Sequence, residues 1–375
     1  MTFTRLEAAI DPNNRLTFLL DWELTMKCNL DCSYCETGIY GGHDNSQRHP
    51  PIDECFKTID FMFAYVDQYM QRRKKSFRHV VLNVYGGESL HHPNIVEILQ
   101  AVREKYQQYA DRWTLKTTCT TNTIVTRKKL SQIIPYVDEF TVSYHSEVSD
   151  KQKELFKHNL LAIKDSGRDL KCVMMMHPDR ELFDDFQQMI IWLKDNNIRH
   201  LPKQLDHDPK KTEFNYTNNQ VTWFKKFYKD KSRSQNNHEF VPVKDSNDNN
   251  DLASTGRACC GGRQLCLDQN YSQREFFVKN HFPDWYCSVD HFFLYIKQVN
   301  GEVYVNKDCK MNYQGQVGPI GNLTNTAEIL STLEQNLLTN KPTIQCKKSR
   351  CYCGLCAPKA QTLDEYNEIL TKYLL

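Results

Sequence analysis

The stretch Met26–Cys35, MKCNLDCSYC, places three cysteines at C-x3-C-x2-C spacing directly after an apolar run at residues 16–24. The apolar run predicts a strand, and the polar residues between the cysteines predict a loop. Thiolates are strong ligands for iron–sulfur clusters, and a cubane cluster has four irons. Three cysteines on one loop therefore hold three of those irons and leave the fourth open to a small molecule.

Two other interpretations compete for this loop. Zinc sites usually space their cysteines as pairs separated by two residues and close with a fourth ligand, which differs from the spacing here. Buried structural cysteines are the second alternative, and Asn29, Asp31 and Ser33 disfavour it because they are polar.

Length and composition narrow the class of protein. The chain has 375 residues, 15 of them cysteine, and a formal net charge of +2. The N-terminus lacks an apolar signal-peptide core and no long apolar run follows, so we expect a cytoplasmic protein with no membrane contact. In a reducing compartment, so many cysteines indicate metal or redox chemistry. Because the net charge is near neutral, we do not expect a nucleic-acid partner.

Strands and helices are predicted to alternate about every 30 residues, which is typical of βα units with a parallel sheet. The helix expected between Pro50-Pro51 and the basic run that starts at Arg72 should bury one face, formed by Phe56, Ile59, Phe63, Val66 and Met70. The six predicted strands cover residues 16–24, 79–85, 113–119, 139–144, 170–176 and 198–205. Polar clusters follow these strands, and parallel α/β folds place their chemistry at the carboxyl ends of the strands.

The cysteine spacing resembles that of the radical S-adenosylmethionine (SAM) family. The resemblance implies a partial (β/α)6 TIM-like barrel, a catalytic [4Fe–4S] cluster on Cys28, Cys32 and Cys35, and SAM on the open iron. His145 and His177, at the same predicted rim, could contact substrate or be structural. By the same resemblance, the SAM-binding residues are Tyr34, Gly86, Gly87, Glu88, Asn122 and Ser143.

A second cysteine-rich region is predicted from residue 256 to 375, after a barrel core at 1–205 and a last helix with a polar linker at 206–255. Asn300-Gly301 predicts a hairpin there. The pattern resembles the small α+β twitch domain, the shortened form of the SPASM domain. That resemblance implies one auxiliary [4Fe–4S] cluster on Cys287, Cys309, Cys353 and Cys356.

This resemblance leaves the roles of several other cysteines unassigned. Cys346 and Cys351 compete for the C-terminal ligand positions, and Cys259, Cys260 and Cys266 depart from the family pattern. The last three could form a further metal site, contribute a thiol or pack. Arg257 and Arg263 beside them could hold an anionic substrate group.

The resemblance implies an enzyme that cleaves SAM reductively to a 5′-deoxyadenosyl radical, which then abstracts hydrogen from a substrate. We expect a peptide or protein substrate and an electron donor such as flavodoxin or ferredoxin. The barrel begins by about residue 16, so no N-terminal leader-binding winged helix is expected. The alternative is dehydrogenation or rearrangement of a small polar metabolite such as a sugar alcohol or aminocyclitol. A non-enzymatic zinc protein that binds nucleic acid is the more remote alternative.

Overall fold

The computed structural model describes a large part of the chain. The described residues are 5–6, 16–35, 48–72, 77–205, 215–234, 282–307, 309, 311–313, 316–339, 344–347, 357 and 359–373. No helix among them is long and apolar enough to cross a membrane.

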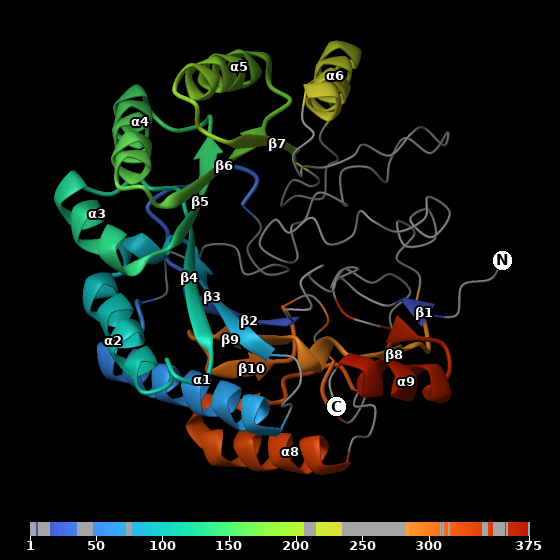
Figure 1. Ribbon diagram of the computed structural model, residues 1–375. Coiled ribbons are helices and arrows are strands. Elements are labelled where there is room, and N and C mark those ends of the chain that lie inside the picture. Colours follow the sequence, from blue (N-terminus) through green and yellow to red (C-terminus); the bar gives the residue numbers. More distant parts are fainter. Residues whose placement is uncertain are drawn as a thin grey trace.

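A nine-stranded sheet forms the centre of the molecule, with the strand order β11-β10-β9-β2-β3-β4-β5-β6-β7 (Figure 1). From β2 to β7, each strand pairs in parallel with the next one along the chain. This confirms the predicted α/β class with six consecutive parallel strands. The six strands are β2 (Leu16–Thr25), β3 (Phe77–Gly86), β4 (Thr114–Thr121), β5 (Glu139–His145), β6 (Asp169–Met176) and β7 (His200–Gln204).

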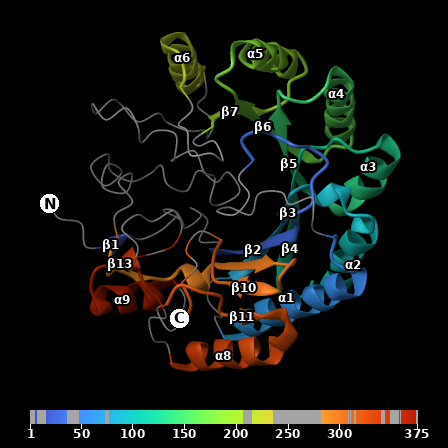
Figure 2. The same ribbon diagram turned by 180° about the vertical axis from the view of Figure 1, so that it is seen from behind.

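Helices cover one face of this curved sheet (Figures 1 and 2). Residues of alternating burial along β5 show why: Phe140, Val142 and Tyr144 are buried in the core shared with the helices, while Ser143 and His145 are half-buried on the other face. The covering helices are α1 (Ile52–Arg72), α2 (Ile95–Gln107), α3 (Arg127–Ile133), α4 (Asp150–Asp165), α5 (Arg180–Asp195) and α6 (Asn218–Ser234).

Helix α1 is buried on more than the one predicted face. Ile59, Phe63 and Val66 are buried as expected, but Phe56 is 39% exposed, so that part of the prediction was wrong. Phe56 lies near the start of α1, while Tyr65 and Tyr69, farther along the helix, are almost completely buried. Their hydroxyls hydrogen-bond residues of the C-terminal region, and α8 (Thr326–Thr339) packs along the helix.

The C-terminal region contributes to two sheets. The strand β9 (Phe293–Lys297) pairs in parallel with β2, so the main sheet crosses the predicted boundary at residue 255. The hairpin turn at Asn300-Gly301 lies before β10 (Glu302–Tyr304) as predicted, with a positive φ of 70° at Gly301. The remaining elements are β11 (Gly321–Asn322), α9 (Leu363–Tyr373) and a small sheet of β1 (Arg5–Leu6), β13 (Lys359–Ala360), β8 (Tyr286–Cys287) and β12 (Ile344–Gln345).

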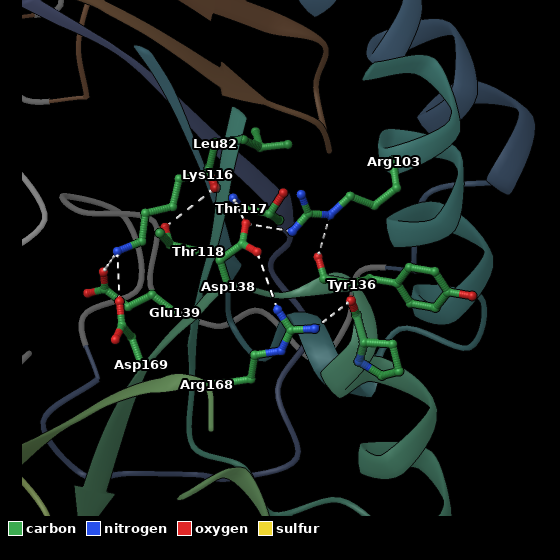
Figure 3. A network of polar contacts seen from close by, with 11 residues as sticks. Leu82, Arg103, Lys116, Thr117, Thr118, Tyr136, Asp138, Glu139, Arg168 and Asp169 are labelled. Carbon is green, nitrogen blue, oxygen red and sulfur yellow. Dashed lines mark hydrogen bonds and ion pairs between the residues drawn. The ribbon is translucent and has the colours of Figure 1, made fainter. Parts of the chain in front are cut away.

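A polar network joins the segments before β5 and β6 at the amino ends of the strands (Figure 3). The Asp138 carboxylate accepts hydrogen bonds from Arg103 at 2.5 Å and from the Thr117 backbone N–H at 2.8 Å. Arg168 lies 3.5 Å away and also donates to the Pro135 carbonyl. Because parallel strands end together, this network is at the opposite end of the sheet from the cysteine loop. We infer that it stabilises the fold.

Substituting Asp138 with asparagine should lower the free energy of unfolding by about 2 kcal/mol, because two arginines and one backbone N–H lose an anionic acceptor. Denaturant titration measures this loss. Asp195→Asn, at the exposed end of α5, is the matched control and should change stability by less than about 0.5 kcal/mol. Equal effects of the two substitutions would contradict a stabilising role for the network.

Candidate functional site

The cysteine loop begins where β2 ends, at the carboxyl edge of the parallel strands. Cys28, Cys32 and Cys35 are half-buried there. The Cys35 backbone N–H donates to the Cys32 carbonyl at 3.0 Å, which closes a turn between the last two cysteines. The structure thus places the three predicted cluster ligands on one short loop at the predicted rim.

Two glycines at the end of β3 allow the base of this loop to pack closely. A Cβ atom on Gly86 would lie 2.0 Å from the Thr25 carbonyl oxygen, and one on Gly87 would lie 2.5 Å from the carbonyl oxygens of Met26 and Lys27. The Gly87 N–H donates to the Thr25 carbonyl at 2.7 Å. Only residues without a Cβ permit this approach, so the glycine pair positions the segment that carries Cys28.

Glu88 is 1% exposed and fixes the neighbouring strand end. Its carboxylate accepts from the backbone N–H of Leu90 at 2.9 Å, the Thr121 hydroxyl at 2.7 Å and the Asn122 N–H at 2.6 Å. Burial raises its pKa above the usual value, and these donors act in the opposite direction. The side chain therefore links the ends of β3 and β4.

Asn122 connects that strand end to the cysteine loop. Its amide Nδ2 donates to Asn29 Oδ1 at 2.9 Å and lies 3.9 Å from the Cys28 sulfur. In return, Asn29 Nδ2 donates to the Ile124 carbonyl at 2.7 Å. Asn29 was missed in the sequence as a functional residue, because a polar residue between cysteines predicts only a loop.

The far side of the loop contacts the end of β5. The Tyr34 hydroxyl lies 2.6 Å from His145 Nδ1, and the two rings stack with centroids 5.9 Å apart. His145 Nδ1 is also 3.5 Å from the Cys32 sulfur. Glu147 accepts hydrogen bonds from both the backbone N–H and the hydroxyl of Ser33. Glu147 was also missed, and its position two residues beyond the predicted rim histidine was the available signal.

Burial is the main cause of the pKa shifts of His145 and Tyr34. It lowers the pKa of His145 to about 4, so the imidazole is neutral at pH 7. It raises the pKa of Tyr34 well above the usual value, with the nearby Cys32 and Glu147 acting in the same direction. Neutral imidazole and phenol side chains therefore lie against the Cys32 sulfur.

The chemistry of the three thiols fits a metal cluster. Burial raises the pKa of Cys28 and of Cys32 to about 12, so a nearby positive charge is needed to hold them as thiolates. Hydrogen-bond donors already point at the sulfurs: the Leu30 N–H is 3.4 Å from the Cys28 sulfur. Within the described residues, no three His, Cys, Asp or Glu side chains are grouped as one metal ion requires. A cubane cluster does not require the three sulfurs to converge on one point, because each thiolate binds a different iron.

Ser143 and His177 lie at the same rim. Ser143 is on β5, on the face away from the helices, and is half-buried two residues before His145. His177 directly follows β6; its Nε2 is 3.8 Å from a Glu147 oxygen, and its ring centroid is 6.2 Å from that of Tyr34. The structure thus brings the ends of β2, β5 and β6 together.

The predicted auxiliary ligands are only partly described. Cys287 on β8 and Cys309 after β10 are buried, as is Cys346. Cys346 pairs through its backbone with Trp285, which places it on the same side of the small sheet as Cys287. The other cysteines and arginines of this region lie outside the described residues: Cys259, Cys260, Cys266, Cys351, Cys353, Cys356, Arg257 and Arg263.

One buried carboxylate near the carboxyl end of β2 belongs to no sequence motif. Glu23 on β2 has an exposed fraction of 0%, and its carboxylate accepts from the Tyr295 hydroxyl of β9 at 2.8 Å. Tyr295 stacks on Tyr304, and Lys307 lies 4.5 Å from the ring centroid of Tyr85. Because β9 comes from the C-terminal region, sequence reasoning on the barrel alone could not place Tyr295 beside Glu23.

Comparison by sequence gives no assignment. No family model matches the chain, and no curated protein matches it.

Comparison of structures assigns the fold. Histidine-tagged anSMEcpe with bound AdoMet matches at a TM-score of 0.50 and 11% identity, covering 95% of this chain and 96% of that chain. Native anSMEcpe with bound AdoMet matches at a TM-score of 0.49 and 12% identity over the same shares of both chains. anSMEcpe is a radical SAM enzyme. The chain described above therefore has the fold of a radical SAM enzyme.

Proposed function

We propose that this chain, which has the fold of a radical SAM enzyme, cleaves SAM reductively and uses the resulting radical on a substrate. One observation carries the proposal. Three half-buried cysteines lie on a single loop at the carboxyl edge of a parallel sheet, and a backbone and a side-chain donor point at the Cys28 sulfur. Active sites of parallel α/β folds are found at this edge.

Cys28, Cys32 and Cys35 would hold a [4Fe–4S] cluster. When bound, a cluster with one open iron supplies the electron that cleaves SAM to methionine and a 5′-deoxyadenosyl radical. The glycine pair and Asn122 keep the loop in place, since they fix the segments on either side of Cys28.

The proposed SAM contacts surround the loop. Gly86, Gly87, Asn122 and Ser143 lie at the ends of β3, β4 and β5, and Tyr34 lies on the loop itself. The Glu88 carboxylate is engaged by three protein donors, so we propose that Glu88 acts by holding Asn122 in position. A cationic amino group such as that of SAM would need the acceptors which backbone carbonyls at this edge provide.

For the second cysteine-rich region, we propose one auxiliary [4Fe–4S] cluster on Cys287, Cys309, Cys353 and Cys356. Cys287 and Cys309 are buried cysteines within the described residues. The placement of Cys346 on the same side of the sheet as Cys287 supports Cys346 as the rival ligand.

The proposed substrate is a peptide or protein, with flavodoxin or ferredoxin as electron donor and the cytoplasm as location. The cysteine pattern of the C-terminal region supports this class, because it resembles domains found in radical enzymes that modify peptides. The nine cysteines within the described residues form no disulfide bonds, which supports a reducing compartment.

The test is anaerobic incubation of the reconstituted full chain with SAM and dithionite. We expect about four irons per catalytic cluster and formation of 5′-deoxyadenosine measured by chromatography. A panel of synthetic peptides and a panel of sugar alcohols then separate the two substrate classes by mass change. Iron-free protein, or iron-loaded protein that leaves SAM intact, would overturn the proposed function; turnover of a polyol alone would overturn the peptide assignment.

A further inference from the structure

Two polar side-chain atoms from separate elements meet beside the sulfur of Cys32. The Tyr34 hydroxyl, His145 Nδ1 and the Cys32 sulfur lie within hydrogen-bond distance: 2.6 Å from oxygen to nitrogen and 3.5 Å from nitrogen to sulfur. The Tyr34 hydroxyl acts on Cys32 as a hydrogen-bond donor, which lowers the pKa of this thiol against the larger, opposite effect of burial. Tyr34 comes from the loop and His145 from the end of β5, so the contact requires the folded sheet.

The protons available to this triangle limit its possible arrangements. The His145 ring can carry a proton at Nδ1, the atom that faces both partners, and the Tyr34 hydroxyl carries another. A metal-bound Cys32 would be a thiolate with no proton, hence an acceptor only. The arrangement that satisfies all three atoms has the His145 N–H donating to the Tyr34 oxygen and the Tyr34 O–H donating to the sulfur.

We propose that His145 and Tyr34 form a hydrogen-bond relay to the Cys32 sulfur that raises the reduction potential of the cluster held there. This inference rests on the proposed function. Hydrogen bonds to ligand sulfurs are one of the factors that set the potential of iron–sulfur clusters. A donor pointing at the sulfur stabilises the extra negative charge of the reduced state, so the relay makes the cluster easier to reduce.

A carboxylate beside the relay allows the direction of the change in reduction potential to be tested. Glu147 is held beside the same loop by Ser33, and its negative charge acts on Cys32 in the opposite direction from a hydrogen-bond donor. Removing the Tyr34 hydroxyl should therefore lower the reduction potential. Removing the Glu147 charge, in Glu147→Gln, should raise it.

The experiment is an EPR-monitored redox titration of the reconstituted full chain, following the reduced-cluster signal that changes when SAM is added. Tyr34→Phe keeps the ring and removes the donor, and His145→Phe keeps the stacked ring while leaving the cysteine motif intact. Tyr34→Phe should reduce the equilibrium constant for cluster reduction about tenfold, equivalent to about 59 mV for one electron. His145→Phe should lower the potential in the same direction but by less, because the Tyr34 hydroxyl still donates to the sulfur. Since His145 acts through Tyr34 in a relay, the double variant should have the potential of Tyr34→Phe.

Tyr109→Phe, the same chemical change at a tyrosine packed on Trp113 of the opposite end, is the matched control and should leave the potential unchanged. Iron content of each variant shows that the loop still binds its cluster. If the wild type binds no cluster, the proposed function fails. If the wild type binds and reduces a cluster, but Tyr34→Phe and His145→Phe both have the potential of the control, the relay alone is overturned.

Discussion

Alanine at Cys28 is expected to abolish SAM cleavage. The thiol is one of three that would hold the cluster, and without it the loop retains two ligands for a four-iron group. The Leu30 N–H and the Asn122 amide would also lose the sulfur to which they point. We expect 5′-deoxyadenosine formation to fall by at least about 10³-fold, with a loss of about four irons per chain.

The matched control is Cys55→Ala in helix α1. Cys55 is fully buried and lies in the core between the helix and the sheet, away from the loop. Its removal should cost about 1 kcal/mol of stability and leave iron binding intact. A Cys28→Ala protein that retains full iron content and cleaves SAM would contradict the assignment of the loop.

Alanine at Gly86 should produce the second large effect, through the backbone. The added Cβ would lie 2.0 Å from the Thr25 carbonyl oxygen, and backbone atoms cannot move aside as a flexible side chain can. The strand ends would separate, which displaces the segment that leads to Cys28. We expect a stability loss of about 3 kcal/mol together with loss of iron from the protein that remains folded, measured by denaturant titration and iron analysis.

Gly167→Ala separates loss of stability from loss of the site. Gly167 follows α4 with a φ of 73°, and a Cβ there would meet nothing within 4 Å. Its substitution should cost about 1 kcal/mol, because a side chain disfavours the left-handed conformation. Iron binding should stay at the wild-type level. If Gly86→Ala also retained its iron, the glycine pair would have no role in positioning the loop.

The strands and the cysteine loop were predictable because their signals are local. The apolar run before the loop, the alternation of strands and helices and the turn at Asn300-Gly301 depend on neighbours in sequence. The structure confirms the parallel strands and the turn. The prediction for Phe56 was wrong because the buried surface of α1 is set by α8 and the sheet, which come from distant segments.

The contacts around the loop could be predicted only in part. His145 was expected at the rim because it ends a strand, but its contact with Tyr34 depends on how far β5 extends beside the loop. Asn29 gave no signal of its own, since single polar residues near a turn are common, and Glu147 was marked only by its position two residues after His145. Tyr295 reaches Glu23 only because β9 pairs with β2, a pairing across more than half of the chain.

The sequence by itself determined the cysteine loop, the order of the βα units and the edge of the sheet at which the site lies. Spacing and periodicity specify these because ligand number and side-chain direction follow from the covalent chain. Tertiary structure alone decided which side chains surround the sulfurs, namely Asn122 at Cys28 and His145 at Cys32. Hydrogen bonds act over about 3 Å, and only the packed strands bring residues so far apart in the chain within that distance.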